Sequence, residues 1–221
     1  HSFPTRRSSD LLLLALPFAA MAVLWHKLPE RIPIHWGWNG QVDGWSPRWF
    51  GLLFLPVVNI VAYLLMTFLP FIDPRMRSDN RVSTGNLMAL STVRLVLTAF
   101  VAFLFAMQML AALDPMVDSG ILVINGVLVT FLIMGNFLGN LKPNRFVGIR
   151  TPWTLKNDET WRATHRNAGP LIVYGSLALL ILQFFVRNIT PVVLGGVILL
   201  ALWAVGYSWW YFHQWASRPK P

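Results

Sequence analysis

Four stretches of this chain run for at least 19 residues without a single Asp, Glu, Lys or Arg: 50–70, 119–138, 168–186 and 189–212. The hydrocarbon core of a bilayer is about 30 Å thick, so a helix needs about 20 apolar residues to cross it. Charged residues make up only 12% of the chain, whereas soluble domains carry about 25%. The pattern therefore predicts an integral membrane protein and argues against a soluble enzyme.

Two further apolar stretches complete the predicted set of spans. Residues 87–113 form a stretch of similar length that includes Arg94, and residues 11–25 form a strongly apolar but short one. We therefore predict an all-α bundle of six transmembrane helices. With the N-terminus inside, 13 Lys and Arg fall in cytoplasmic segments and four fall outside. The positive-inside rule then places both the N- and C-termini in the cytoplasm.

The first ten residues differ in composition from all that follows. We predict that residues 1–10 are a non-native, adapter-like segment, which would explain why the first span is short. A cleaved secretory signal with Arg6 and Arg7 as its basic region is the competing interpretation. Without this segment the charge bias is 11 to four, so the predicted orientation does not depend on it.

Two connections are long enough to carry a function, and they define the predicted organisation. Residues 11–70 hold the first two helices with an extracytoplasmic cap at 26–49. Residues 71–221 hold four helices with a cytoplasmic segment at 139–167. The chain has no Cys, which excludes disulfides, thiolate catalysis and Cys-ligated zinc.

The outer connection is rich in Pro, Gly and Trp. Its glycines and prolines disfavour a continuous helix, and Asn39-Gly40 and Asp43-Gly44 are strong turn dipeptides. We expect a compact, turn-rich cap seated at the lipid interface by its tryptophans. One His and one Asp are too few for a metal site, and we predict no bound metal. The candidate cap residues are Pro33, His35, Trp36, Asn39, Gly40, Asp43 and Gly44.

The inner connection carries two helix-start signals. Thr151 before Pro152 is typical of an N-cap followed by proline at the first helical position. Asn157 before Asp158 and Glu159 is typical of a second N-cap, with acids where the helix dipole favours them. We expect a short helix after Asn157, lying in the headgroup region.

Polar and aromatic groups are dense in this inner segment. Interfacial packing alone would account for them, and binding of an anionic or peptide partner is the sharper hypothesis. Trp161 and His165, four residues apart, would share one helical face. The candidate partner-binding residues are Asn144, Arg145, Gly148, Arg150, Thr151, Pro152, Trp153, Thr154, Asn157, Trp161 and His165.

Few polar residues lie inside the spans. Arg94 and Asn136 are each expected about two turns from the cytoplasmic side, and an unpaired charge at that depth is costly. We therefore hypothesise that Arg94 and Asn136 meet. Gly135 and Gly139 have the GxxxG spacing that lets another helix approach closely.

The inner segment resembles the SdpI family of bacterial membrane proteins. Members show a stretch like Asn-x-x-x-Gly-Ile-Arg-Thr-Pro-Trp-Thr-Leu followed by Trp, which matches residues 144–155 and Trp161 here. Thr164-His165-Arg166 and Gly169 also match. The outer segment, from Leu28-Pro29 through Asp43-Gly44, is similar to a small domain of unknown function that accompanies the family. The resemblance extends over residues 11–215.

This resemblance implies a six-helix protein of the bacterial cytoplasmic membrane. Family membership implies protection against a secreted, membrane-active toxin peptide and, in the namesake system, binding of a small cytoplasmic DNA-binding repressor. The expected partners are thus membrane lipid, a toxin peptide and a repressor protein, with no direct contact to nucleic acid and no cofactor. The oligomeric state is left open.

Two other functions compete with this interpretation. A small transporter or channel-like protein for an amphipathic solute would use Arg94, Asn136 and His165 at its inner mouth. An enzyme with His165 as base is the weaker alternative, because no activated Ser or Cys accompanies that residue. We expect a binding protein and not an enzyme.

Overall fold

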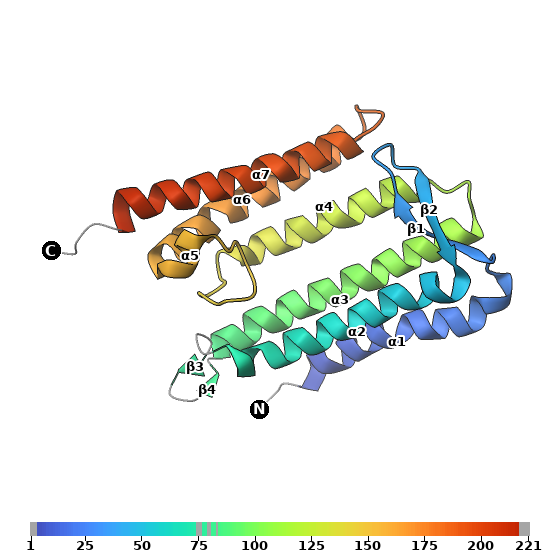
Figure 1. Ribbon diagram of the computed structural model, residues 1–221, viewed down its shortest axis with the longest axis horizontal. Coiled ribbons are helices and arrows are strands. Elements are labelled where there is room, and N and C mark those ends of the chain that lie inside the picture. The colour runs from blue at the N-terminus through green and yellow to red at the C-terminus, as the bar shows by residue number, and fades with distance from the viewer. Residues whose placement is uncertain (1–3, 74–76, 79–80, 83, 217–221) are drawn as a thin grey trace. The chain divides into compact units, whose positions relative to one another are not determined.

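The computed structural model describes residues 4–73, 77–78, 81–82 and 84–216, and it is built mainly of helices (Figure 1). The elements in chain order are α1 (Pro4–Leu24), η1 (Trp25–Lys27), β1 (Arg31–Trp36), β2 (Val42–Pro47), α2 (Arg48–Ile72), β3 (Arg77–Ser78), β4 (Arg81–Val82), α3 (Thr84–Leu113), α4 (Ser119–Leu138), α5 (Pro152–Lys156), α6 (Asp158–Leu182), α7 (Thr190–Tyr211) and η3 (Phe212–Ala216). Of the predicted non-native segment, residues 1–3 lie outside this description, and so do Arg75, Arg218 and Lys220 of the charge count.

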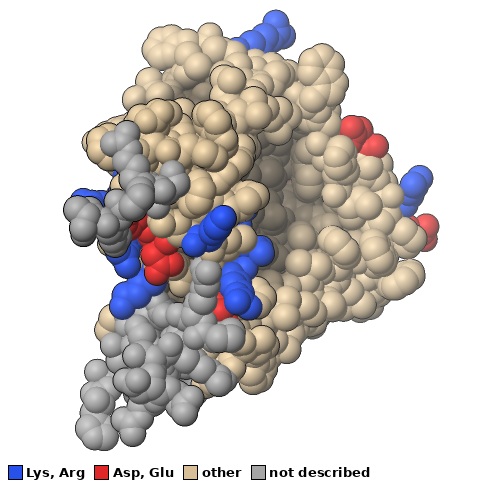
Figure 2. Space-filling model, turned by 60° about the vertical axis from the view of Figure 1, so that its left-hand side comes forward, with Lys and Arg blue, Asp and Glu red and all other residues tan. Residues whose placement is uncertain are grey.

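Within the described residues, five helices have the length and apolar composition needed to cross a membrane. They are Ser9–Lys27, Arg48–Ile72, Met88–Leu113, Ser119–Leu138 and Thr190–Trp215. Large apolar side chains on them stay exposed: Phe68 of α2 is 56% exposed and Leu199 of α7 is 69% exposed. Uncharged residues cover most of the face in Figure 2. Exposed apolar surface on this scale suits contact with lipid and not with water, which supports a multi-pass membrane protein.

The sixth predicted span, 168–186, does not form a helix of its own. Its residues continue α6, which begins at Asp158 and ends at Leu182. The first turns of α6 carry Asp158, Glu159, Arg162 and Arg166, so only its second half is free of charge. The prediction of a short, separate headgroup helix is therefore wrong. Those residues form the start of this longer helix, which continues through Pro170.

Contacts divide the chain into two compact units. The first comprises His1–Leu65 and Val93–Thr130, and the second comprises Met66–Thr92 and Phe131–Pro221. The boundary between them passes through α2, α3 and α4.

The outer cap in the first unit is a β-hairpin. Strands β1 and β2 pair antiparallel, with Ile32 opposite Ser46 and His35 opposite Gly44, and register shifts interrupt the ladder on both sides of His35. Gly40 in the connecting turn has φ +79°, a conformation that glycine adopts without a steric penalty. The turn-rich cap was thus predicted without its strands.

Side chains and close backbone contacts fasten the hairpin to the helices of its own unit. Trp36 donates from Nε1–H to the hydroxyl of Ser119 at 2.9 Å, and Gln108 donates to the carbonyl of Pro33 at 2.9 Å. A Cβ on Gly120 would lie 2.0 Å from the carbonyl oxygen of Gly40. The cap is therefore held against the end of α3 and the start of α4.

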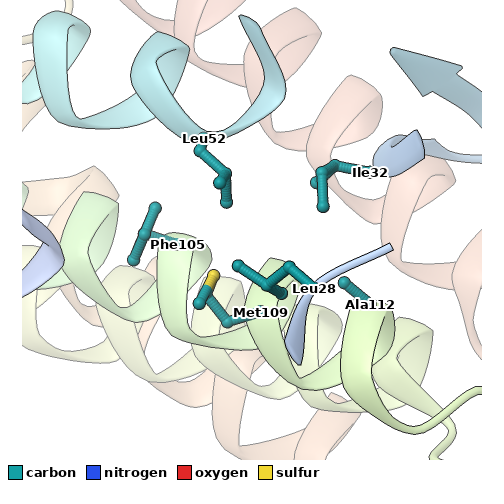
Figure 3. Packing of buried hydrophobic residues seen from close by; sticks show 6 residues of the cluster. All are labelled: Leu28, Ile32, Leu52, Phe105, Met109 and Ala112. Carbon is teal, nitrogen blue, oxygen red and sulfur yellow. The ribbon is translucent and has the colours of Figure 1, made fainter. Parts of the chain in front are cut away.

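A small hydrophobic core lies beneath the hairpin (Figure 3). It joins the loop before β1, the strand β1 itself, the second turn of α2 and the last turns of α3. Ile32 and Leu52 are fully buried. The members of the cluster are Leu28, Ile32, Leu52, Phe105, Met109 and Ala112. Apolar packing of this kind fixes the hairpin at the helix ends.

In the second unit, glycines let α4 and α6 approach closely. A Cβ on Gly135 would lie 3.0 Å from the carbonyl oxygen of Gly169, and a Cβ on Gly139 would lie 3.8 Å from the Cα of Arg166. Residue numbers rise along α4 as they fall along α6, so the two helices run antiparallel. The close approach predicted from the GxxxG spacing is confirmed at Gly135, whereas a Cβ on Gly139 would make only ordinary contact with α6.

Candidate functional site

The polar segment between α4 and α6 is held by two helix caps. The hydroxyl of Thr151 accepts from the backbone N–H of Thr154, and the Thr154 side chain accepts from the backbone N–H of Thr151, which forms a capping box at α5. The Asn157 side chain accepts from the N–H of Thr160 at the start of α6. Both predicted N-caps are confirmed.

Asn144 organises the loop that leads into α5. Its side-chain oxygen accepts from the N–H groups of Phe146 and Val147 at 2.9 and 2.7 Å. Its amide donates to the carbonyls of Lys142 and Val147 at 3.0 and 2.9 Å. The residue is only 4% exposed. Because these four bonds are internal, Asn144 shapes the segment and does not face a partner.

The loop is joined to the end of α2 by a residue that the sequence analysis missed. Asp73 is fully buried, and its carboxylate accepts from the backbone N–H of Arg145 at 2.8 Å. Val147 packs against Leu69 and Leu90 beside it. A lone Asp just past an apolar span gave no sign of this role, because its partner lies 72 residues away.

His165 and Trp161 form the buried centre of the segment. Their rings are stacked with centroids 4.1 Å apart, and neither residue is exposed. Trp161 donates from Nε1–H to the carbonyl of Leu141 at 2.8 Å. The prediction that both share one face of a helix is confirmed, and that face is turned toward protein.

Both ring nitrogens of His165 are engaged. Nδ1 lies 2.8 Å from the carbonyl of Trp161, and Nε2 lies 2.9 Å from the backbone N–H of Ile149. These partners assign the neutral tautomer with the proton on Nδ1, since Nε2 must accept. Burial lowers the pKa of His165 to about 4, against a smaller opposite effect of the bond to Trp161. The ring is therefore uncharged at neutral pH.

Gly148 allows the loop to pass close to these rings. It has φ +119°, and a Cβ there would lie 2.5 Å from Nε2 of His165 and 3.1 Å from the ring of Trp161. Glycine adopts this φ without a steric penalty, and a residue with a Cβ would clash with the ring of His165.

The end of α7 and the turn η3 that follows it pack against α5. The hydroxyl of Thr151 donates to that of Ser208 at 2.9 Å, and both residues are buried. The rings of Trp153 and His213 lie 6.5 Å apart, and the ammonium of Lys156 lies 5.6 Å over the ring of Phe212. Within its own unit, the segment is thus held by contacts to the end of α2, to α6 and to α7.

What the segment leaves exposed is mainly positive. Arg145, Arg150, Arg162 and Arg166 are exposed, whereas Asn144, Thr154, Trp161 and His165 are buried. Within the described part of the chain, these four arginine side chains form no ion pair. The arrangement gives a preformed platform whose buried polar side chains are hydrogen-bonded, apart from the hydroxyl of Thr164, and whose surface favours an anionic partner.

The cap residues divide in a similar way. Pro33 is buried, while His35, Asn39 and Asp43 are exposed. Nδ1 of His35 bonds to the carboxylate of Asp43, and Gly44 leaves room for this, since its Cβ would lie 2.7 Å from Cβ of His35. Among the described residues there is no group of three or more His, Cys, Asp or Glu side chains that would hold a metal.

Arg94 has a different partner from the one expected. Its guanidinium pairs with Asp10 at 2.8 Å and lies 4.8 Å over the ring of Tyr63, all within the first unit. The Asn136 side chain instead donates to the carbonyl of Leu132. The hypothesis that Arg94 and Asn136 satisfy each other is therefore wrong, because a carboxylate neutralises the charge where an amide was expected.

Comparisons with known proteins agree with the resemblance inferred from the motif. The SdpI/YfhL protein family matches residues 140–208, which include the inner segment from Asn144 onward. A domain of unknown function, DUF1648, matches residues 12–60, which include the hairpin. Immunity protein SdpI of Bacillus subtilis (strain 168) is 26% identical over 193 residues, covering 87% of this chain and 88% of that protein. No solved structure matches the chain.

Proposed function

We propose that this chain, which carries the SdpI family region, is a membrane immunity protein that protects a bacterial cell from a membrane-active toxin peptide. The observation that carries the proposal is the similarity to Immunity protein SdpI over 87% of the chain. The matched stretch is long enough to take in both polar segments, so the likeness is not limited to apolar helices, whose composition is shared by unrelated membrane proteins.

The hairpin is the proposed site of toxin contact. It is hydrogen-bonded to α3 and α4. Two of its tryptophan side chains are exposed: Trp38 is 73% exposed and Trp45 is 44% exposed. Tryptophan suits the boundary between lipid and water, which is where an amphipathic peptide accumulates. A preformed aromatic surface binds such a peptide with little loss of conformational entropy.

The platform between α4 and α6 is the proposed docking site for a cytoplasmic partner, such as a small repressor protein. Its exposed arginines offer charge-assisted hydrogen bonds to acidic side chains. Since the buried polar residues keep the loop in one conformation, a partner would meet these arginines already positioned.

We propose six membrane crossings with both termini in the cytoplasm of a bacterial cell. The uncharged half of α6 together with the residues up to Val186 supplies the crossing between α4 and α7. The strong bias of Lys and Arg toward one side of the spans supports this orientation. It puts the hairpin outside and the platform inside.

Expression in a toxin-sensitive bacterium tests the proposed function. Cells with and without the protein are exposed to a panel of membrane-active peptides, and survival is counted at equal peptide concentration. Protection against at least one peptide is expected. Equal killing across the panel contradicts immunity, and proteoliposome flux of an amphipathic solute would then support the transporter alternative.

A binding role also fits the state of His165 better than an enzymatic one. A general base needs a free lone pair within reach of substrate, and Nε2 of His165 is buried and accepts from Ile149. The transporter alternative would use Arg94 and His165 at its inner mouth. His165 is engaged by these hydrogen bonds and Arg94 pairs with Asp10, so fewer polar groups remain for a solute.

A further inference from the structure

A pocket of about 380 Å³ lies between the last turn of α4 and the middle of α6, inside the second unit. Glycines open it: Gly135, Gly139 and Gly169 all line it. A Cβ on Gly135 would press against Gly169, but one on Gly139 would make only ordinary contacts. The pocket is therefore unfilled space beside the helix crossing and not a packing gap within it.

Polar groups converge on this pocket. Asn136, Asn140, Arg166 and Tyr174 line it, and all four are exposed. Pro170 has no N–H to donate to the carbonyl of Arg166 one turn earlier, so that carbonyl lacks its helical hydrogen bond. The pocket thus offers amide, hydroxyl and carbonyl groups to a ligand that both donates and accepts.

The charge of the pocket is positive. Arg166 is the one cation among its lining residues at neutral pH, and no Asp or Glu lines it. His165 also lines the pocket but is neutral, with both nitrogens engaged. A guanidinium beside amide groups, with no competing carboxylate, suits phosphate geometry.

The position of the pocket in the fold favours the phosphate of a lipid headgroup over a free phosphate. It lies at the last turn of the α4 membrane-crossing helix, Ser119–Leu138, so it opens at the depth of the lipid headgroups. Further along α6, Val173 lines the pocket and Leu177, four residues on, is 41% exposed. Residues four apart share a helix face, so an apolar track leads from the pocket toward the bilayer interior.

We propose that this pocket binds the headgroup of an anionic phospholipid. The phosphate pairs with Arg166, the amides of Asn136 and Asn140 bind headgroup or ester oxygens, and an acyl chain lies along Val173 and Leu177. The lipid fills the space that the glycines leave and so joins α4 to α6. This role is separate from toxin recognition and does not depend on it.

Native mass spectrometry of the full chain, purified in detergent and supplied with phosphatidylglycerol, tests the proposal. The wild-type chain is expected to retain one phosphatidylglycerol in preference to diacylglycerol, which lacks phosphate. Arg166→Gln is expected to lower the occupancy about fivefold, the effect of one cation near a lipid surface. Gly139→Leu, which fills the pocket with a side chain, is expected to abolish retention.

Arg162→Gln is the matched control, because Arg162 is exposed one turn earlier on α6 but does not line the pocket. It should retain lipid as the wild type does. Equal losses in Arg162→Gln and Arg166→Gln would overturn the proposal, since they would show diffuse attraction. Displacement by glycerol 3-phosphate at the concentration at which phosphatidylglycerol binds would also overturn it, by assigning the pocket to a soluble phosphate. If Arg166→Gln does not fold, Gly139→Leu decides: retention of lipid in that variant contradicts the site.

Discussion

Nε2 of His165 accepts a hydrogen bond from the backbone N–H of Ile149 at 2.9 Å. A nitrogen that accepts has no proton, so this bond exists only while the ring is neutral. On its other side the ring donates to Trp161 within α6. His165 therefore joins α6 to the loop before α5. The residues of the family motif thus serve first to hold this loop in its fold.

The stability of the segment is expected to fall in acid through His165. Its folded-state pKa of about 4 lies below the ordinary value of 6.5, so the unfolded chain takes up a proton first as the pH drops. The contribution is complete above pH 6.5 and is lost between pH 6.5 and about 4, at up to about 1.4 kcal/mol per pH unit. Unfolding of the detergent-solubilised protein, followed across this range, measures the slope.

His165→Phe serves as the control for that slope. It keeps an aromatic ring against Trp161 but leaves the N–H of Ile149 without its acceptor, which costs about 1–3 kcal/mol at neutral pH. The variant should be less stable than wild type at neutral pH and less dependent on pH. An unchanged slope in His165→Phe would assign the pH dependence to other groups.

Gly148→Ala should loosen the loop between α4 and α5. The positive φ of Gly148 costs an alanine about 1–2 kcal/mol, and the new Cβ would lie 2.5 Å from Nε2 of His165. Faster protease cleavage within residues 139–151 is the expected result. Gly175→Ala on α6, where a Cβ meets nothing within 4 Å, is the control and should cleave as wild type does. Equal cleavage of Gly148→Ala and wild type would count against the close approach.

Gly135→Leu should separate α4 from α6. Even a Cβ at this position would lie 2.9 Å from Val173 and 3.0 Å from the carbonyl of Gly169, and overpacking typically costs about 1–3 kcal/mol. Lower thermal stability in detergent is expected. Gly195→Leu on α7, which faces open space, should leave stability close to wild type, and comparable losses in both variants would contradict a specific crossing.

The pair formed by Arg94 and Asp10 can be tested by a double variant. Asp10 is 1% exposed, so Arg94→Met alone leaves a buried carboxylate without its cation, at a cost of about 3–5 kcal/mol. Adding Asp10→Leu removes that charge and should recover most of the stability. If the double variant is no more stable than Arg94→Met, the two residues do not depend on each other.

Local signals predicted much of this architecture. The five helices long and apolar enough to span a membrane, the N-caps at Thr151 and Asn157, and the close approach at Gly135 depend on residues within a few turns of one another. Such patterns fix local structure through capping, sterics and apolar length, so they can be inferred without knowing what packs against them.

The errors arose where the deciding partner was distant or the pattern was broken. Pro33 and the register shifts around His35 disrupt the alternation by which strands are recognised, so the hairpin was predicted only as turns. Arg94 was assigned to Asn136 because the carboxylate that pairs with it lies 84 residues away. Asp73 was missed for the same reason.

The candidate site was predicted by position more than by role. The motif residues do cluster in one segment, but the side chains of Asn144, Thr154 and His165 make their hydrogen bonds inside that segment. A sequence shows which residues have polar groups, whereas burial decides which of those groups remain for a partner. The exposed arginines, and not the buried motif residues, are what this platform offers.

In the proposed topology the hairpin and the platform face opposite sides of the membrane, and cysteine labelling tests this directly. The chain has no Cys, so Trp38→Cys in the hairpin turn and Arg150→Cys in the platform each give a unique thiol at an exposed position. With a membrane-impermeant maleimide on intact cells, Trp38→Cys should be labelled at once, and Arg150→Cys only after the membrane is permeabilised. Labelling of both thiols on intact cells would contradict the account.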